Sequence, residues 1–376
     1  MNRNAASPAR LLGLLGIVVC ALAFLLKATD ARAAASQDWS PFVLVSGLLL
    51  VGLVADDDGL FKAAGNRLAR ASSSGLLLFV GATALIGMVT AVLNLDTSVA
   101  FLTPVLVYAA RSRGGGEAPL LYGCLLFSNA GSLFLPGSNL TNLIVLGHAR
   151  LTGATFISHM WAPGLVALIV TALVVGVVER RDLQLKATPV EDPESATLGL
   201  GLAAIIVSAV LVVGLSTPAL PVFGVGVVAV GIRVLRGRER TQRVVDVLGV
   251  PLLVGLFGVA VALGTLGRAW SYPANAMTHL NVWATSVVAA LVSVAFNNLP
   301  AASLLSAHAP AHPFALLIGL NLGPNLFVSG SLAWLLWLRA SRVAGAEPSI
   351  ARASVLGLWS VPLAIAAALT ALVLVG

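Results

Sequence analysis

The stretch "SNAGSLFLPGSNLTNLIVLGHA", residues 128–149, decides how this chain folds, because an apolar segment is interrupted in its middle. Pro136 and Gly137 both disfavour a helix interior, and Ser138 and Asn139 follow them directly. A second apolar segment is interrupted in the same way at "GPNLFVSGS", residues 323–331. The sequence therefore predicts two broken helices, over 119–148 and 314–338, each containing unwound backbone.

The composition places these segments in a membrane. The chain has 376 residues, of which 58% are hydrophobic and only 10% are charged, and its mean hydropathy is +0.98. Apolar runs recur along the whole chain, so we predict an all-α polytopic membrane protein without a soluble domain. The net charge of +7 is read as contact with lipid headgroups, and no nucleic-acid partner is expected. Cys20 and Cys124 are far apart, so neither a disulfide, a metal site nor a cofactor is expected.

Two further segments are too short to cross a bilayer twice. A hydrocarbon core of about 30 Å requires about 20 helical residues. Residues 75–110 and 281–309 each contain one arm below this length, with "NLDT" (94–97) and "NNLP" (297–300) between the arms. We therefore predict two re-entrant helical hairpins with their tips at these tetrapeptides.

The hairpins and the broken helices recur in the same order, which indicates a diverged duplication. Asp38 and Gly47 recur 208 residues later, Asn94 recurs 203 residues later, and Asn129 with Gly131 recur 192 residues later. Counting the crossings predicts that the two repeats are inverted relative to each other. The expected division is an N-terminal transmembrane helix (1–37), a first repeat (38–179), a cytoplasmic linker (180–197) and a second repeat (198–376).

Lysine and arginine indicate the orientation. With these crossings, 18 of the 22 Lys and Arg residues fall on the side that carries the N-terminus. The positive-inside rule then predicts a cytoplasmic N-terminus, an outside C-terminus and a place in the inner (cytoplasmic) membrane. Residues 1–36 also resemble a cleaved signal peptide, and the topology is the same in either case.

Paired broken helices are how secondary transporters build a binding site at the bilayer midplane. Asp96 is the acid that the pattern places away from loops and helix ends, so a coupling role for a proton or cation is predicted, with a helix N-cap as the alternative. Asp56, Asp57 and Asp58 are predicted to form a solvated loop. Arg339 follows the second break, and it is expected either to snorkel to the headgroups or to help a polar solute leave.

Three of these segments resemble the arsenite efflux permeases of the ArsB type, within the ion transporter superfamily. They are "SNAGSLFLPGSNLTNLIV" (128–145), "FNNLPAASLL" (296–305) and "IGLNLGPNLFVSGSLAWLLWLR" (318–339). The resemblance implies export of arsenite or antimonite in exchange for protons, by elevator-like alternating access in a homodimer. It also implies a small inorganic oxyacid as substrate, and it allows a soluble arsenite-stimulated ATPase as a partner.

Carried over to this chain, the resemblance and the two tips give a set of substrate-binding candidates beside Asp96. They are Asn94, Asn129, Ser138, Asn139, Thr141, Asn142, Asn297, Asn298, Asn321, Gly323, Asn325 and Ser331. The Asn, Ser and Thr side chains of this set and the backbone dipoles are uncharged hydrogen-bonding groups, which suits arsenite because it is an uncharged trihydroxy solute at neutral pH.

Two other transport functions stay open on the same fold: a sodium-coupled carboxylate or anion symporter, and a sodium/proton antiporter. Neither hairpin tip reads Ser-Asn-Thr and neither break contains Pro-Pro-Asn, which argues against the carboxylate branch. An intramembrane enzyme is not expected, because the sequence has no HExxH motif and a single Asp96 cannot form an aspartyl dyad.

Overall fold

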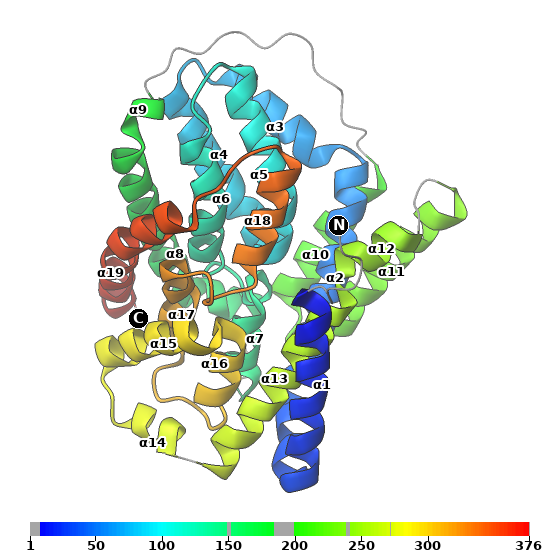
Figure 1. The fold of residues 1–376 in the computed structure, drawn as a ribbon, viewed down its shortest axis with the longest axis vertical. Helices are drawn as coiled ribbons and strands as arrows, with labels where there is room; N and C mark the ends of the chain where they lie inside the picture. The colour runs from blue at the N-terminus through cyan, green and yellow to red at the C-terminus, as the bar shows by residue number, and fades with distance from the viewer. Residues whose placement is uncertain (1–7, 149–151, 184–198, 238–240, 271, 376) are drawn as a thin grey trace.

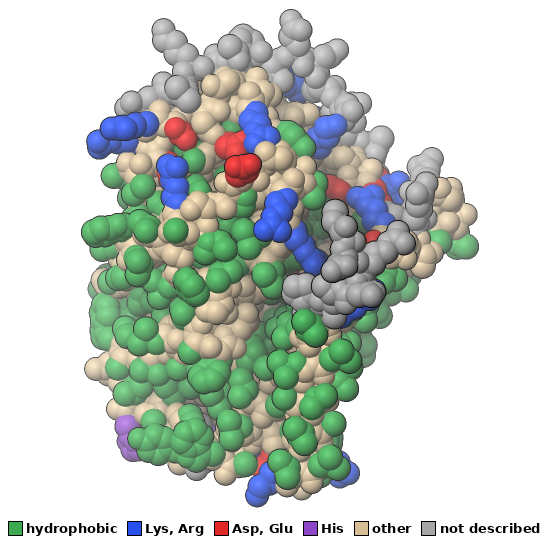
Figure 2. Space-filling view, in the orientation of Figure 1, with side chains coloured by type: hydrophobic (Ala, Val, Ile, Leu, Met, Phe, Trp, Pro, Cys, Tyr) green, Lys and Arg blue, Asp and Glu red, His purple; other side chains and the backbone are tan. Residues whose placement is uncertain are grey.

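The structure, a computed structural model, describes residues 8–148, 152–183, 199–237, 241–270 and 272–375 (Figure 1). Within these ranges the regular elements are all helices, which confirms the predicted all-α class. Five helical stretches are long and apolar enough to cross a membrane: Ala28–Asp57, Gly75–Val92, Gly153–Val178, Thr241–Ala269 and Ile350–Val375. The surface agrees, because hydrophobic side chains cover most of the face shown in Figure 2, while Lys and Arg gather mainly in its upper half.

The elements follow one another in two comparable series. The N-terminal half contains α1 (Pro8–Leu26), α2 (Ala28–Asp57), α3 (Leu60–Ala71), α4 (Gly75–Val92), α5 (Leu95–Ser112), α6 (Ala118–Gly131), η1 (Pro136–Ser138), α7 (Leu140–Val145), η2 (Leu146–His148), α8 (Gly153–Val178) and α9 (Arg180–Leu183). The C-terminal half contains α10 (Leu200–Gly214), α11 (Ala219–Leu235), α12 (Thr241–Leu248), α13 (Val250–Ala269), α14 (Tyr272–Thr278), α15 (Val282–Phe296), α16 (Asn298–Leu305), α17 (Pro313–Leu322), η3 (Gly323–Leu326), α18 (Ala333–Val343) and α19 (Ile350–Val375).

Asparagine residues stand at the start of the helices that follow the two hairpin tips and the first interruption. Asn94 caps α5 by accepting a hydrogen bond from the Thr97 backbone N–H at 2.6 Å, and Asn139 caps α7 through Thr141 at 3.2 Å. Asn297 precedes α16 with a φ of 73°, a left-handed conformation that asparagine tolerates better than most residues. Local capping thus explains why each helix begins again where it does.

The N-terminal region differs from the expected division. The apolar run begins near residue 42, but α2 begins at Ala28, so the proposed boundary between residues 37 and 38 lies inside one continuous helix. The segment "ATDARAAAS" is rich in alanine, which favours a helix without raising the hydropathy much. Asp38 is consequently an interior residue of a long helix, and it is only 1% exposed.

Close glycine contacts hold four of the helices in pairs. A Cβ atom at Gly16 of α1 would lie 2.2 Å from the carbonyl oxygen of Gly255 in α13. A Cβ at Gly47 of α2 would lie 2.6 Å from the Cα of Phe223 in α11. Small residues allow such backbone approach, which is a main source of helix association in membranes. Two helices of each half therefore pack against two helices of the other half.

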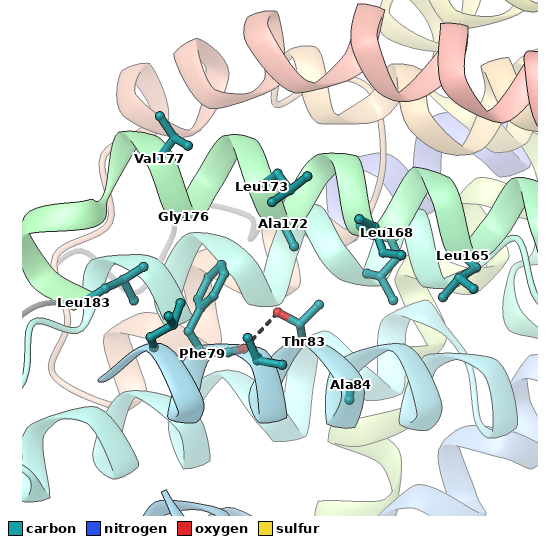
Figure 3. Close-up of a pocket in the computed structure, with 13 residues that line it drawn as sticks. Phe79, Thr83, Ala84, Leu165, Leu168, Ala172, Leu173, Gly176, Val177 and Leu183 are labelled. Atoms are coloured by element: carbon teal, nitrogen blue, oxygen red, sulfur yellow. Dashed lines mark hydrogen bonds between the residues drawn. The ribbon is translucent and has the colours of Figure 1, made fainter. Parts of the chain in front are cut away.

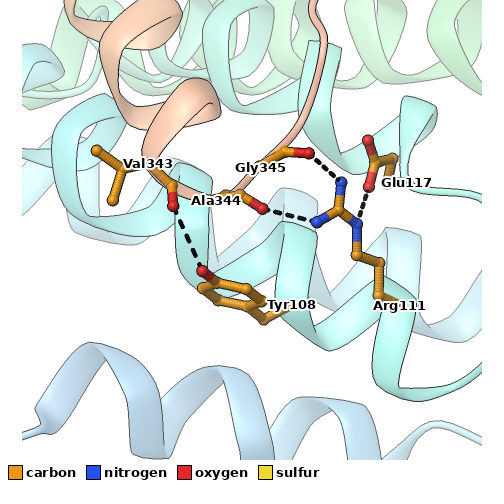
Figure 4. Close-up of polar contacts among 6 residues, drawn as sticks. All are labelled: Tyr108, Arg111, Glu117, Val343, Ala344 and Gly345. Carbon is orange, nitrogen blue, oxygen red and sulfur yellow. Dashed lines mark hydrogen bonds and ion pairs between the residues drawn. The ribbon is translucent and has the colours of Figure 1, made fainter.

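Helices next to the interruptions also pack against helices of the other half. Helix α5 packs against α18, and α7 packs against α16, as Figure 1 shows. Arg111, in the last turn of α5, holds the C-terminal end of α18. Its guanidinium donates to the carbonyl oxygens of Ala344 at 2.6 Å and Gly345 at 3.0 Å (Figure 4). The same guanidinium pairs with Glu117, which orients it.

The predicted solvated loop at residues 56–58 is corrected by the structure. Asp56 and Asp57 end α2 and both pair with Arg243 of α12. Asp58 is 6% exposed, pairs with Arg233 of α11 and accepts a 2.6 Å hydrogen bond from the Gly201 backbone N–H. The acids face Arg233 of α11 and Arg243 of α12 because helix packing brings α2 against both helices, which the order of residues along the chain does not reveal.

Candidate functional site

Asparagine side chains from both interruptions meet in the interior. The Asn129 amide nitrogen donates to the Asn325 amide oxygen at 2.8 Å. The Asn321 oxygen accepts from Ser132 and from Asn139, both at 2.6 Å, while its nitrogen donates to the Asn142 oxygen at 2.8 Å. Asn129, Asn139, Asn142, Asn321 and Asn325, which we call the amide cluster, are all at most 6% exposed.

The amide cluster also satisfies backbone groups that the interruptions release. Asn142 donates to the carbonyl oxygens of Ser132 and Leu135 at 2.7 and 3.1 Å. Asn325 donates to the carbonyl of Leu126 at 3.2 Å. Unwound backbone at membrane depth requires such partners. The cluster therefore has a structural role as well as the chemistry of a polar binding site.

Several buried polar atoms of the first hairpin tip and of the two broken helices have no hydrogen-bond partner within the described part of the chain. They are the Asn129 amide oxygen, the Asn94 amide nitrogen, and the hydroxyl oxygens of Thr97, Thr141 and Ser331. Buried polar groups are normally paired, and leaving one unpaired costs about 1–3 kcal/mol. These atoms offer both donors and acceptors to a small polar solute, and none of them is charged.

The hairpin tips lie against the interruptions. Ser138 donates to the carbonyl of Ala91 at the end of α4, at 3.3 Å. At the second tip, the Asn298 backbone N–H donates to the Gly330 carbonyl at 2.8 Å, and Asn297 donates to that of Ser329 at 3.4 Å. Gly323 allows α15 to approach, because a Cβ there would lie 2.5 Å from the Cα of Ala290. The structure thus brings the predicted candidates from the tips next to those from the breaks.

Asp96 lies outside the amide cluster. It follows the cap residue Asn94 in the first turn of α5 and lines a cavity of about 350 Å³ bounded by α5, α12, α13 and α18. Asp246 and Arg339 line the same cavity, whose remaining walls are mostly apolar. The predicted set of site residues is therefore divided between a neutral cluster and a cavity with two carboxylates and one guanidinium.

A cavity between α4 and α8 has the wrong chemistry for a polar solute. It has a volume of about 510 Å³ and runs between α4 and α8, as Figure 3 shows. Its lining is apolar except for Thr83, whose hydroxyl donates to the Phe79 carbonyl of its own helix at 2.9 Å. Leu76, Val80, Leu165 and Leu173 of this lining are exposed on the surface. This groove suits hydrocarbon chains of the bilayer rather than a transported oxyacid.

Three polar residues of this region are not among the site residues predicted from the sequence. Ser132 bridges the two interruptions through Asn321, and Ser128 donates to Ser98 of α5 at 3.2 Å. Asp38 is a second acid inside a membrane helix, and Ser303 of α16 donates to it at 3.0 Å. The two serines lie in the quoted motif, so the motif could have indicated them. The alanine-rich start of α2 gave no indication that Asp38 lies inside a membrane helix.

Comparison with known proteins agrees with this architecture. The profile of the CitMHS family, described as citrate transporters, matches residues 7–337. The chain belongs to this family. Membership, together with the apolar helices, identifies a multi-pass membrane transporter and indicates a carrier rather than a catalytic enzyme.

Curated relatives confirm the resemblance to arsenical pumps. An "Arsenical pump membrane protein" of Escherichia coli is 26% identical over 338 residues, covering 80% of this chain and 78% of the relative. Proteins of the same name from E. coli K12 and Yersinia enterocolitica are 24% identical over 336 residues and 26% identical over 335 residues, with the same coverage. The crystal structure of the Alcanivorax borkumensis YdaH transporter is 14% identical, with a TM-score of 0.54 over 98% of both chains, and so shares the fold.

Proposed function

We propose that this protein exports arsenite or antimonite in exchange for protons, by elevator-like alternating access. The amide cluster is the observation that carries the proposal, because it joins both interruptions through uncharged side chains. The arsenical pump relatives supply the substrate class.

The charge of the site favours a neutral oxyacid over citrate. Citrate carries several carboxylates at neutral pH, and arginine is the side chain best suited to pair with carboxylates. The five members of the amide cluster are all asparagines. A trihydroxy solute such as arsenite needs both donors and acceptors but no counter-ion, and the unpartnered amide and hydroxyl atoms provide both.

Asp96 is the proposed proton-coupling residue. An ionisable side chain at membrane depth is expensive to keep there without a function. Asp96 lines a cavity of about 350 Å³, so a proton has a polar position to occupy between α12, α13 and α18.

The contacts between helices of the two halves support the proposed inverted repeats and the elevator-like mechanism. Helix α5 contacts α18, α7 contacts α16, α2 contacts α11 and α1 contacts α13. Under the predicted repeat, the pair α5–α18 corresponds to the pair α16–α7, and the pair α2–α11 corresponds to α13–α1, as expected for an inverted duplication. The moving part of the proposal consists of the hairpins and broken helices, and the scaffold consists of α1, α2, α10, α11 and α13.

The proposed placement is the inner membrane, with the basic upper end of Figure 2 in the cytoplasm and the C-terminus outside. We also propose a homodimer and, as an optional partner, a soluble arsenite-stimulated ATPase. Cross-linking in native membranes tests the dimer, and co-purification with a candidate ATPase tests the partner.

Arsenite uptake into everted membrane vesicles under an imposed proton gradient tests the function. Accumulation that an uncoupler abolishes and that persists without sodium supports proton-coupled export. Sodium-dependent uptake of citrate, with no arsenite accumulation, would instead establish the second candidate, a sodium-coupled carboxylate symporter, which the family description favours. A sodium/proton antiporter would exchange the two cations without either solute.

A further inference from the structure

A compact group of polar side chains closes one end of the interface between scaffold and hairpin. Gln37 of α2 donates to the carbonyl oxygens of Ile144 in α7 at 2.9 Å and Ser306 after α16 at 3.3 Å. One residue later, Asp38 accepts a 3.0 Å hydrogen bond from Ser303 of α16. These contacts tie α2 to both elements that the C-terminal hairpin and the first break contribute at this end.

Asp38 is buried with less compensation than an ionised carboxylate needs. The residue is 1% exposed, Ser303 supplies its single described hydrogen bond, and its second oxygen has no partner within the described residues. Arg268 of α13 acts on Asp38 electrostatically, but its guanidinium donates to the Gln37 amide oxygen at 2.5 Å and to the Gly264 carbonyl at 3.0 Å.

Among the residues that the structure describes, the other helices packed here contribute no charge that acts on Asp38. Helices α7 and α16 contain no charged residue, and the only charged residue of α1, Arg10, lies at its far end. Asp30 in the first turn of α2 acts on Arg268 rather than on Asp38. Burying an unpaired ionised carboxylate is far more costly than burying a protonated one.

We propose that Asp38 is a proton-binding site that holds a proton while this interface is closed and loses it to water when the interface opens. The proposal rests on the alternating access described above, and it makes closure of this end dependent on the pH of the adjoining compartment. In the orientation proposed above, that compartment is the outside.

The opposite end of α13 supports this assignment. Asp246, which stands 208 residues after Asp38, lines the open cavity beside the start of α13 together with Asp96, whereas Arg268 lies near the end of that helix. A helix of this length spans about 30 Å. An acid therefore faces the hairpins at each end of the scaffold, in an open cavity at one end and in a closed contact at the other.

The direction of the pH effect follows from linkage. The closed state binds one more proton than the open state, so acidification of the outside favours closure by up to about tenfold per pH unit. Above the range in which Asp38 ionises in the open state, closure becomes progressively weaker.

Thiol accessibility tests this prediction without substrate. In a chain with Cys20→Ala and Cys124→Ala, the reporter Ser306→Cys is buried beside Gln37, and Thr278→Cys on α14 is an exposed reference. The labelling rate of the reporter with a membrane-impermeant maleimide, relative to the reference, is measured in right-side-out vesicles between pH 6 and pH 8.

We expect the relative rate to rise at least fivefold with pH in the protein that retains Asp38. Asp38→Asn, which stays neutral, is expected to hold the rate low and independent of pH. Asp246→Asn is the matched control on the other end and is expected to keep the pH dependence. An unchanged pH response in Asp38→Asn would overturn the proposal.

A second reporter, Ala307→Cys, is 4% exposed as alanine and replaces the first if that variant does not fold. Because the assay contains no arsenite, failure of arsenite transport leaves its result intact. Conversely, normal arsenite export with a flat labelling profile would reject the Asp38 site alone.

Discussion

Asn129 donates a hydrogen bond to Asn325 at 2.8 Å, although 196 residues separate them in the chain. This bond joins the last turn of α6 to the 3-10 turn η3, so it connects the two interruptions directly. Each side chain also donates to a backbone carbonyl of α6, at 3.2 Å for both Leu125 and Leu126. The pair therefore holds the interrupted segment η3 against α6 and leaves the Asn129 amide oxygen, which has no partner among the described residues, at the same place.

Replacing Asn321 is expected to be the most damaging change in the amide cluster. Asn321→Ala removes hydrogen bonds to Ser132, Asn139 and Asn142 at once. We expect loss of arsenite transport and a destabilisation of about 2–3 kcal/mol, because the partners are left buried and unpaired. Thermal unfolding in detergent measures the second effect, with Ser158→Ala on the exposed surface as the control. Wild-type transport and stability would show that the cluster is dispensable.

Asp96→Asn is expected to abolish proton-coupled accumulation while the protein stays folded. The substitution keeps the size of the side chain and removes only the titratable group in the cavity. Everted vesicles with and without an uncoupler provide the measurement, and Asp96→Glu should retain part of the activity. Undiminished uncoupler-sensitive transport in Asp96→Asn would remove Asp96 from the mechanism.

Gly323→Ala is expected to separate α17 from α15. The added Cβ would lie 2.5 Å from the Cα of Ala290 and 2.6 Å from the hydroxyl of Ser293, so the backbone must shift. We expect a destabilisation of about 1–3 kcal/mol, as in other overpacked interiors. Gly224→Ala in α11 is the matched control, because nothing lies within 4 Å of its added Cβ. Equal melting temperatures for the two variants would contradict this packing argument.

Arg111→Lys is expected to loosen the end of α18. Lysine cannot reproduce the planar fork that reaches the carbonyls of Ala344 and Gly345, although it keeps the charge beside Glu117. Because Arg111 is 40% exposed, the loss of stability should stay near 1 kcal/mol or below. Faster amide hydrogen exchange at residues 343–346 is the expected signal, and unchanged exchange there would contradict the clamp.

The sequence predicts the interruptions but not the partners that occupy them. Proline, glycine and capping asparagines act locally, so "LPGSN" and "LGPNL" locate η1 and η3 within a few residues. The choice of Asn325 as the partner of Asn129, and the central place of Asn321, depend on how two distant segments pack. No periodicity in one sequence encodes that choice.

The burial of two acids likewise could not be predicted from the sequence. The burial of Asp38 is not predicted, because an alanine-rich segment extends α2 beyond the apolar run. Asp58 resembles part of a solvated triplet, yet helix packing buries it against Arg233. Hydropathy indicates whether a helix lies in lipid or in water. Burial of these carboxylates depends instead on packing against residues that come much later in the chain.

The pairing of α5 with α18 and of α7 with α16 has a consequence for biosynthesis. When α7 leaves the ribosome, the partner of Asn139 and Asn142, which is Asn321, has not yet been made. The newly inserted N-terminal half therefore lacks this hydrogen-bond partner until translation reaches α17. Folding of this carrier is completed by its last third, and a truncated chain presents to membrane quality control the same asparagines that the finished protein conceals.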